Sequence, residues 1–141
     1  MYGQNPYANY KETQIKTASP EKLLMMLFDG GIKFMKQAKD HLEKKEMKEA
    51  NNKLQRSQAI LLELMNSLDT KQGEVAENLM LLYDYMLNEL IQANVRKDTE
   101  KIDNIMEMMR EMKETFQEAS KQASSEKNNI KTQAGGIIGK A

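Results

Sequence analysis

The sequence predicts an all-α protein folded as an antiparallel up-down-up-down four-helix bundle, and three observations support this prediction. Four segments carry apolar residues at alternating steps of three and four, which is the period of a bundle helix. Short polar breaks join the segments, and short connections make neighbouring helices antiparallel. The chain has only two Pro and seven Gly, so its interior is almost free of helix breakers.

The composition divides the chain into three parts. The length of 141 residues suits one domain. Residues 1–18 are polar with spaced tyrosines, and we expect them to form an N-terminal arm. Residues 19–124 hold the four helical segments of the bundle. Residues 125–141 are polar and then Gly-rich, which predicts a flexible, disordered tail.

The first helix has the strongest start signal in the chain. Ser19 is a preferred N-cap, and Pro20 suits the first helical position because its missing N–H would be unpaired there. Glu21 complements the positive end of the helix dipole. We expect this helix to run to about Lys44. Its predicted inward stripe is Leu24, Phe28, Gly31, Met35, Ala38 and Leu42.

Three further helices follow from the same pattern. The second starts near Glu46 and ends before a polar turn at 69–73, and the third covers about 74–96. After a break at 97–99 the fourth helix is expected to fade near Ser124. Their predicted inward residues are Met47, Ala50, Leu54, Ser57, Leu61, Leu64 and Leu68, then Val75, Leu79, Leu82, Met86, Leu90 and Ala93, and finally Ile102, Ile105, Met109, Met112, Phe116, Ala119 and Ala123.

The composition argues against several classes of function. Lys and Arg number 21 and so do Asp and Glu, so the basic excess that is typical of a nucleic-acid binder is missing. The absence of Cys excludes disulfides and cysteine-ligated metal. The N-terminus is polar and no apolar run approaches membrane-spanning length. We therefore expect a cytoplasmic protein that does not insert into membranes.

The sequence also lacks the residues that an enzyme of this fold would need. His41 is the only histidine, whereas a di-iron bundle needs Glu-x-x-His on two helices, and Ala38 stands where the Glu would be. We therefore expect no enzyme activity, no cofactor and no metal. A histidine phosphotransfer bundle is the remaining alternative, since Lys44 follows His41. Lys45 stands where that class carries Gly, so a solvated surface histidine is the favoured interpretation.

The apolar faces are wider than a four-helix core requires. Residues 23–28 form six consecutive apolar positions, which encircle the first helix, and the other helices carry apolar residues beside their inward stripes. Surplus apolar surface of this kind predicts exposed grooves for a partner helix. The twelve methionines favour an adaptable surface. The predicted partner-binding residues are Met25, Ile60, Leu62, Met65, Met80, Tyr83, Leu87, Met106 and Met108.

The N-terminal arm carries apolar side chains in an otherwise polar stretch. Tyr7, Tyr10 and Ile15 are more apolar surface than a free terminus usually exposes. We therefore expect these three residues to cover part of a groove until a partner displaces them.

Several motifs resemble those of the flagellar secretion chaperone FliS family. In that family a tyrosine-containing arm leads into Ser-Pro, then an apolar run, then an aromatic residue followed by Asp-Gly. The matching stretches here are 5–10, Ile15, 17–23, 26–30 and 82–86, with Leu90, Ala93 and Asn94 behind them. Phe116 stands where the family often has Trp, and both are large aromatic residues. The resemblance covers roughly residues 2–120.

The resemblance implies a definite function. Members of this family are antiparallel four-helix bundles that bind newly made flagellin in the cytoplasm and prevent its premature polymerisation. They bind the C-terminal segment of flagellin and deliver it to the flagellar type III export apparatus. An alternative from the apolar faces alone is a homo-oligomeric helical adaptor, in which the surplus surface pairs with a second copy.

Overall fold

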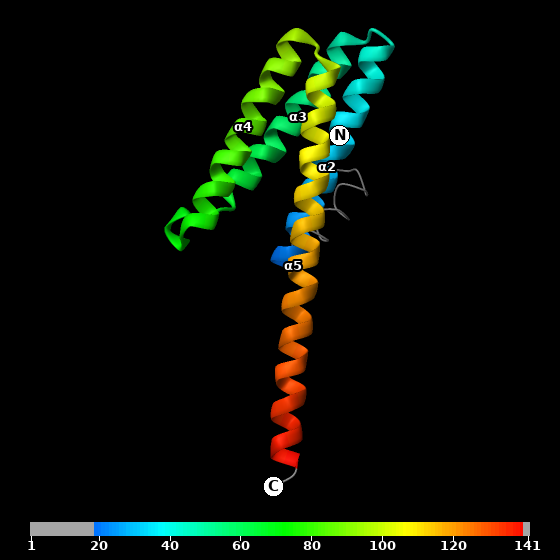
Figure 1. Ribbon diagram of the computed structural model, residues 1–141. Helices are drawn as coiled ribbons and strands as arrows, with labels where there is room; N and C mark the ends of the chain where they lie inside the picture. The colour runs from blue at the N-terminus through cyan, green and yellow to red at the C-terminus, as the bar shows by residue number, and fades with distance from the viewer. Residues whose placement is uncertain (1–18, 140–141) are drawn as a thin grey trace, which may run out of the picture.

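The computed structural model describes the backbone of residues 19–139, and the side chains to 125, so the predicted arm lies outside the described residues. The chain forms four α-helices and, within the described residues, no strand. They are α2 (Pro20–Glu43), α3 (Met47–Asn66), α4 (Glu74–Arg96) and α5 (Thr99–Gly139), with a short 3₁₀ turn, η1 (Thr70–Gln72), before α4 (Figure 1). The predicted four-helix bundle is confirmed.

The helices are arranged so that each contacts two neighbours. α2 packs against α3 and α5, and α4 packs against the same two helices. Figure 1 shows α2 and α4 running in one direction and α3 and α5 in the other, with the start of α4 diverging from α5. α5 extends well past the ends of the other helices (Figure 1).

Short polar side chains cap the starts of α2 and α5, and the cap at Ser19 is the one that the sequence predicts. The Ser19 hydroxyl accepts a hydrogen bond from the Lys22 backbone N–H at 3.2 Å, and Pro20 follows as the first helical residue. At the start of α5, the Asp98 carboxylate accepts a hydrogen bond from the Lys101 backbone N–H at 3.2 Å. Both helices therefore begin where a short polar side chain satisfies a free backbone donor.

The end of the fourth helix differs from the expectation. The helix was predicted to fade near Ser124, whereas α5 continues to Gly139. The stretch 119–134 contains no Pro and no Gly, so nothing in its backbone chemistry interrupts the ladder of i to i−4 hydrogen bonds. Polar composition alone is therefore a poor guide to where this helix ends.

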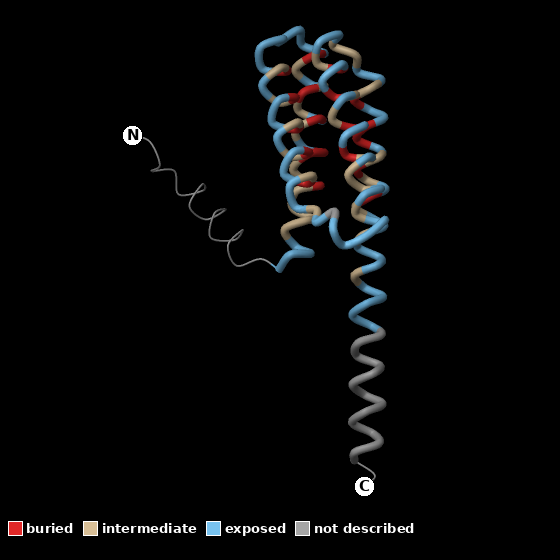
Figure 2. Tube along the Cα trace, turned by 90° about the vertical axis from the view of Figure 1, so that its left-hand side faces the viewer, coloured by how far each residue is buried: buried red, intermediate tan, exposed pale blue. Residues whose placement is uncertain are grey.

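The core lies mainly towards one end of the bundle. Its buried apolar residues are Phe28, Ile32, Met35, Ala38, Leu42, Ala50, Leu54, Leu61, Leu64, Tyr83, Met86, Leu90, Ala93, Ile102, Ile105, Met106, Met109 and Met112. Figure 2 shows the buried positions gathered towards the end of the bundle where α2 meets α3 and α4 meets α5. We call this half the closed end. The opposite half, with the start of α2, the end of α3 and the start of α4, is the open end.

The predicted inward stripes match the core at the closed end and run past it at the open end. Leu24, Leu68, Leu79, Leu82 and Phe116 were expected inside but are only partly buried. Four residues predicted as inward are exposed in the structure, namely Met47, Val75, Ala119 and Ala123. Ala119 and Ala123 line a shallow hollow between α5 and the first turns of α2 instead of a packed core.

Candidate docking groove

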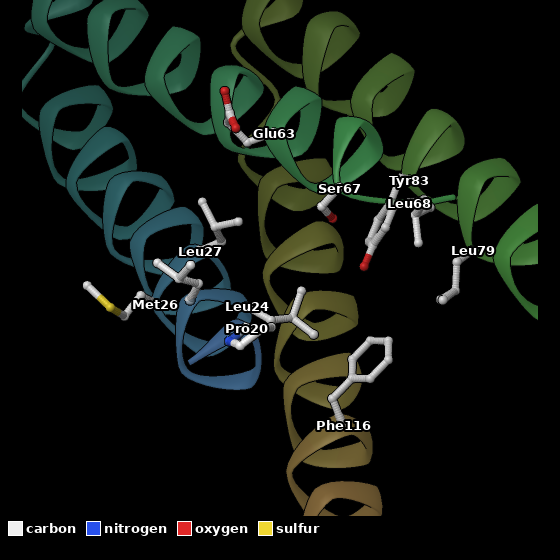
Figure 3. A pocket seen from close by; sticks show the side chains of 11 residues that line it. Pro20, Leu24, Met26, Leu27, Glu63, Ser67, Leu68, Leu79, Tyr83 and Phe116 are labelled. Atoms are coloured by element: carbon white, nitrogen blue, oxygen red, sulfur yellow. The ribbon is translucent and has the colours of Figure 1, made fainter. Parts of the chain in front are cut away.

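An apolar groove with a volume of about 780 Å³ lies at the open end of the bundle (Figure 3). All four helices contribute to it: the first two turns of α2, the end of α3, the first half of α4 and the middle of α5. Its lining residues are Pro20, Leu23, Leu24, Met26, Leu27, Glu63, Ser67, Leu68, Leu79, Tyr83 and Phe116. We call this site the open-end groove.

The groove exists because the apolar stripes continue beyond the point where the helices pack closely. α4 diverges from α5 towards its N-terminal end, so Leu79 of α4 and Phe116 of α5 line an open space instead of closing a core (Figure 1). Leu24 and Leu68 line the same space from α2 and α3. The result is a partly exposed apolar surface, which in soluble proteins usually marks a binding site.

Phe116 holds a central place at the open end. Its ring stacks on the buried ring of Phe28, with 5.8 Å between the ring centroids and 24° between their planes, so it is firmly seated. Phe116 also lines a shallow hollow between α4 and α5, with Leu82 and Met108, and another between α2 and α5, with Met25. The apolar surface is therefore continuous around Phe116 over three sides of the bundle.

The open-end groove contains a few polar groups. Figure 3 shows the hydroxyls of Tyr83 and Ser67 directed into the groove, while Glu63 lies at its rim, away from Phe116. Tyr83 is 1% exposed, and this burial raises the pKa of its hydroxyl to about 12. The Ser67 hydroxyl donates a hydrogen bond to the Leu64 carbonyl at 2.7 Å. Within the described residues Glu63 forms no ion pair.

A second candidate surface follows the outer seam between α3 and α4. The Asn94 side-chain amide donates a hydrogen bond to Asn51 at 2.8 Å, which fixes how the two helices face each other. In antiparallel helices, residues two heptads from such a pair face each other again, so we expect Met65 of α3 to face Met80 of α4. Both methionines are partly buried. We call this surface the α3–α4 seam.

The predicted partner-binding residues fall in different places. Met65, Met80 and Leu87 are partly buried along the α3–α4 seam, and Leu62 is 48% exposed beside it. Three others are also partly buried. Met25 lines the hollow between α2 and α5, and Met108 lines the hollow between α4 and α5. Ile60 packs against α2 at Gly30.

Two of these residues are buried, which corrects the expectation that they lie on outer faces. Met106 is only 4% exposed and belongs to the core, because it sits one position from Ile105 on the side of α5 that meets the bundle. Tyr83 is also buried, but its hydroxyl end reaches the open-end groove. The arm residues Tyr7, Tyr10 and Ile15 lie outside the described residues.

Sequence reasoning missed the residues that form most of the open-end groove. Leu24, Leu68, Leu79 and Phe116 were expected in the core because they continue the inward stripes. The available signal was the apolar run at 23–28, which is too wide for one seam and marks the helix that supplies more of the lining than any other.

The described residues lack the side-chain grouping that a metal site requires. They contain no group of three or more His, Cys, Asp or Glu side chains that could hold a metal ion. His41 is partly exposed at the closed end, and its Nδ1 lies 3.2 Å from a carboxylate oxygen of Glu46. No helix in the described part of the chain is long and apolar enough to span a membrane. The arrangement is suited to binding an apolar polypeptide segment.

The fold and the groove together define a small helical-bundle binding protein. Comparison with known proteins agrees with that class. A family model, Flagellar protein FliS, matches residues 3–123. The chain is 32% identical over 134 residues to the Flagellar secretion chaperone FliS of Bacillus subtilis, covering 95% of this chain and 97% of the relative. The chain belongs to the FliS family of flagellar secretion chaperones.

Other members of the family from distant bacteria are similar over most of their length. The Flagellar secretion chaperone FliS of Salmonella typhimurium is 35% identical over 115 residues, which cover 80% of this chain and 85% of the relative. The Flagellar secretion chaperone FliS of Vibrio cholerae is 31% identical over 106 residues, covering 74% and 78% respectively. The predicted resemblance is therefore confirmed at the level of the family, which is one of chaperones and not of enzymes.

Proposed function

We propose that this protein is a cytoplasmic export chaperone for flagellin. It binds the C-terminal segment of flagellin in its apolar surface grooves, prevents premature polymerisation and delivers its client to the flagellar type III export apparatus. Membership of the family supports the role, and the open-end groove is the single structural observation that carries it. The α3–α4 seam extends the same apolar surface along the bundle.

The physical mechanism follows from what a polymerising segment exposes. An amphipathic helix that assembles into a filament must present an apolar face, and burial of that face on the chaperone removes it from competing subunits. Ordering the segment costs free energy, so many apolar contacts must offset that cost, at about 25 cal/mol for each Å² buried. The Leu and Met side chains of the groove supply such contacts and adapt to the shape of the client.

The N-terminal arm is proposed as a movable cover. Residues 1–18 join the bundle at Ser19, next to Pro20, and Pro20 itself lines the open-end groove. The arm is therefore tethered at the edge of the groove, where its local concentration is high. Tyr7, Tyr10 and Ile15 are the side chains proposed to occupy the groove until flagellin displaces them.

A polymerisation assay tests the proposed function. Monomeric flagellin is induced to polymerise, and light scattering is followed with and without an equimolar amount of the full-length chain. We expect the chain to suppress growth of the filaments. Polymerisation at an unchanged rate with an equimolar amount of the chain present would contradict the proposal.

Self-association is a second candidate function, and one observation favours it. Of the seven exposed large apolar residues in the described part of the chain, five lie on α4, namely Val75, Leu81, Tyr85, Ile91 and Val95. Leu81, Tyr85, Ile91 and Val95 share one outer side of α4, whereas Val75 continues the inward stripe beyond the packed core. An exposed apolar side of this kind is suited to pairing with a second copy. Sedimentation separates the two functions: a monomer that forms a one-to-one complex with flagellin supports the chaperone, and a dimer that leaves flagellin unbound supports the adaptor.

A further inference from the structure

The hydrogen-bonding state of the open-end groove constrains what can occupy it. Tyr83 is 1% exposed and its hydroxyl is directed into the groove, yet among the described residues none accepts its proton. In the free protein this hydroxyl faces the open groove, where water can accept its proton. An occupant that displaces the water and brings no acceptor leaves the hydroxyl buried and unpaired, which costs free energy. An occupant that fills the groove must therefore bring a hydrogen-bond acceptor to this point.

Ser67 adds a second requirement on the same wall of the groove. Its hydroxyl proton is already donated to the Leu64 carbonyl, so only the lone pairs of its oxygen remain for a partner. Inside its rim, where the Glu63 carboxylate lies, the groove therefore offers a donor from Tyr83 and an acceptor from Ser67. A peptide unit presents the complementary pair, a C=O and an N–H, on adjacent atoms.

The middle of a helix cannot satisfy both groups, because its C=O and N–H groups are already bonded within the helix. The last turn of a helix has free carbonyls, and the residues that follow it have free N–H groups. We propose that the open-end groove binds the point at which a helix of the client segment ends and the chain becomes extended. Tyr83 donates to a carbonyl of the last turn, and Ser67 accepts from an N–H just beyond it.

This inference rests on the proposed function, because it names the part of the flagellin segment that the groove selects. The apolar lining still supplies most of the affinity, and the two hydroxyls fix the register of the bound helix. The groove therefore binds a client helix that ends beside Tyr83 and Ser67 more tightly than a helix that continues past them.

The test compares hydroxyl variants of the full-length chain in calorimetric titrations with a peptide from the C-terminus of the cognate flagellin. Tyr83→Phe keeps the ring and removes only the hydroxyl, and we expect it to weaken binding by roughly 3- to 10-fold, the range for a lost hydrogen bond. Ser67→Ala is expected to weaken binding less. Tyr85→Phe is the matched control, because Tyr85 lies on the same helix and is 53% exposed. The affinity of this variant for the peptide should equal that of the unmodified chain.

A double-mutant cycle then identifies the acceptor. Each polar side chain of the peptide is replaced in turn by Ala, and the loss caused by Tyr83→Phe is measured again for each peptide. We expect the loss to persist with every peptide, which assigns the acceptor to the backbone. A loss that vanishes with one peptide would overturn the proposal in favour of a side-chain acceptor. An unchanged or a tighter affinity of Tyr83→Phe would also overturn it.

The outcome separates this inference from the proposed function. Leu68→Glu places a charge in the apolar lining of the groove and should abolish binding whichever polar group is recognised. If Leu68→Glu abolishes binding while Tyr83→Phe has no effect, only the inference fails. If the unmodified chain binds no flagellin peptide at all, the proposed function fails first.

Discussion

Single residues decide how closely the helices of this bundle approach one another. A Cβ atom at Gly31 would lie 2.7 Å from the Met109 sulfur, whereas one at Gly30 would lie 3.0 Å from the end of the Ile60 side chain. Met109 is completely buried, so it has little room to move, while Ile60 is partly exposed. The two neighbouring glycines therefore do not have the same structural role.

We expect opposite effects from alanine at these two positions. Alanine gains about 1 kcal/mol of helix propensity over glycine, and this gain should survive in Gly30→Ala because Ile60 can shift. In Gly31→Ala, displacement of Met109 in the packed core should cost more than the gain, so the variant should be less stable by about 1 kcal/mol. Urea unfolding of both variants measures the difference, and equal stabilities would contradict this account of the packing.

Tyr83 should give the stability of the fold a distinct dependence on pH. Its pKa is about 12 in the folded chain, above the usual value near 10, because burial disfavours the charged form. Between those two values the folded state holds a proton that the unfolded state has lost, so stability falls as the pH rises from about 10 to about 12.

At about 1.4 kcal/mol for each pKa unit, this effect is at most about 3 kcal/mol, and it is smaller to the extent that water in the open groove screens the hydroxyl. Chemical unfolding at a series of alkaline pH values measures this effect as a fall in the free energy of unfolding. The Tyr83→Phe variant lacks the hydroxyl, so its free energy of unfolding should fall less over this range, by only the amount that other groups cause. Parallel pH profiles of the two proteins would show that the Tyr83 hydroxyl is not buried in solution.

At the scale of the helices, the sequence predicted the elements well and the position of the groove poorly. The Ser19 cap and the three-and-four stepping located the helices to within a few residues, except for the end of α5. The stepping does not reveal how far a stripe remains packed, because Leu79 and Phe116 continue the pattern of buried residues. Only the divergence of α4 from α5, a property of several helices together, turns their stripes into a groove.

The α3–α4 seam allows a prediction at the same scale. Met80→Glu and Leu62→Glu each place a charge on this partly exposed surface, so both should weaken binding of the flagellin peptide while helicity by circular dichroism stays unchanged. Gln92→Glu adds the same charge to an exposed position of α4 and should leave the affinity unchanged. Unfolding of Met80→Glu would mean that Met80 is a core residue.

At the scale of the whole molecule, the two ends of the bundle have different roles, one in stability and the other in binding. The closed end holds the buried core, including Met35, Leu54, Met86 and Ile105, and supplies the stability of the fold. The apolar residues at the open end are only partly buried, so they contribute less to the free energy of unfolding than core residues do. The same residues are left free to form a binding surface. The family membership agrees with the groove, because a chaperone needs apolar surface that is not buried in its own core.

The central claim is that the open-end groove binds the C-terminal segment of flagellin. The most direct measurement is a calorimetric titration of that peptide into the full-length chain and into a Leu24→Glu variant, with Val95→Glu as a control on the outer face of α4. We predict one-to-one binding at micromolar peptide concentration for the unmodified chain and for the control, and a loss of at least 10-fold in Leu24→Glu. Equal affinities for all three proteins, or no heat from the unmodified chain, would contradict the account.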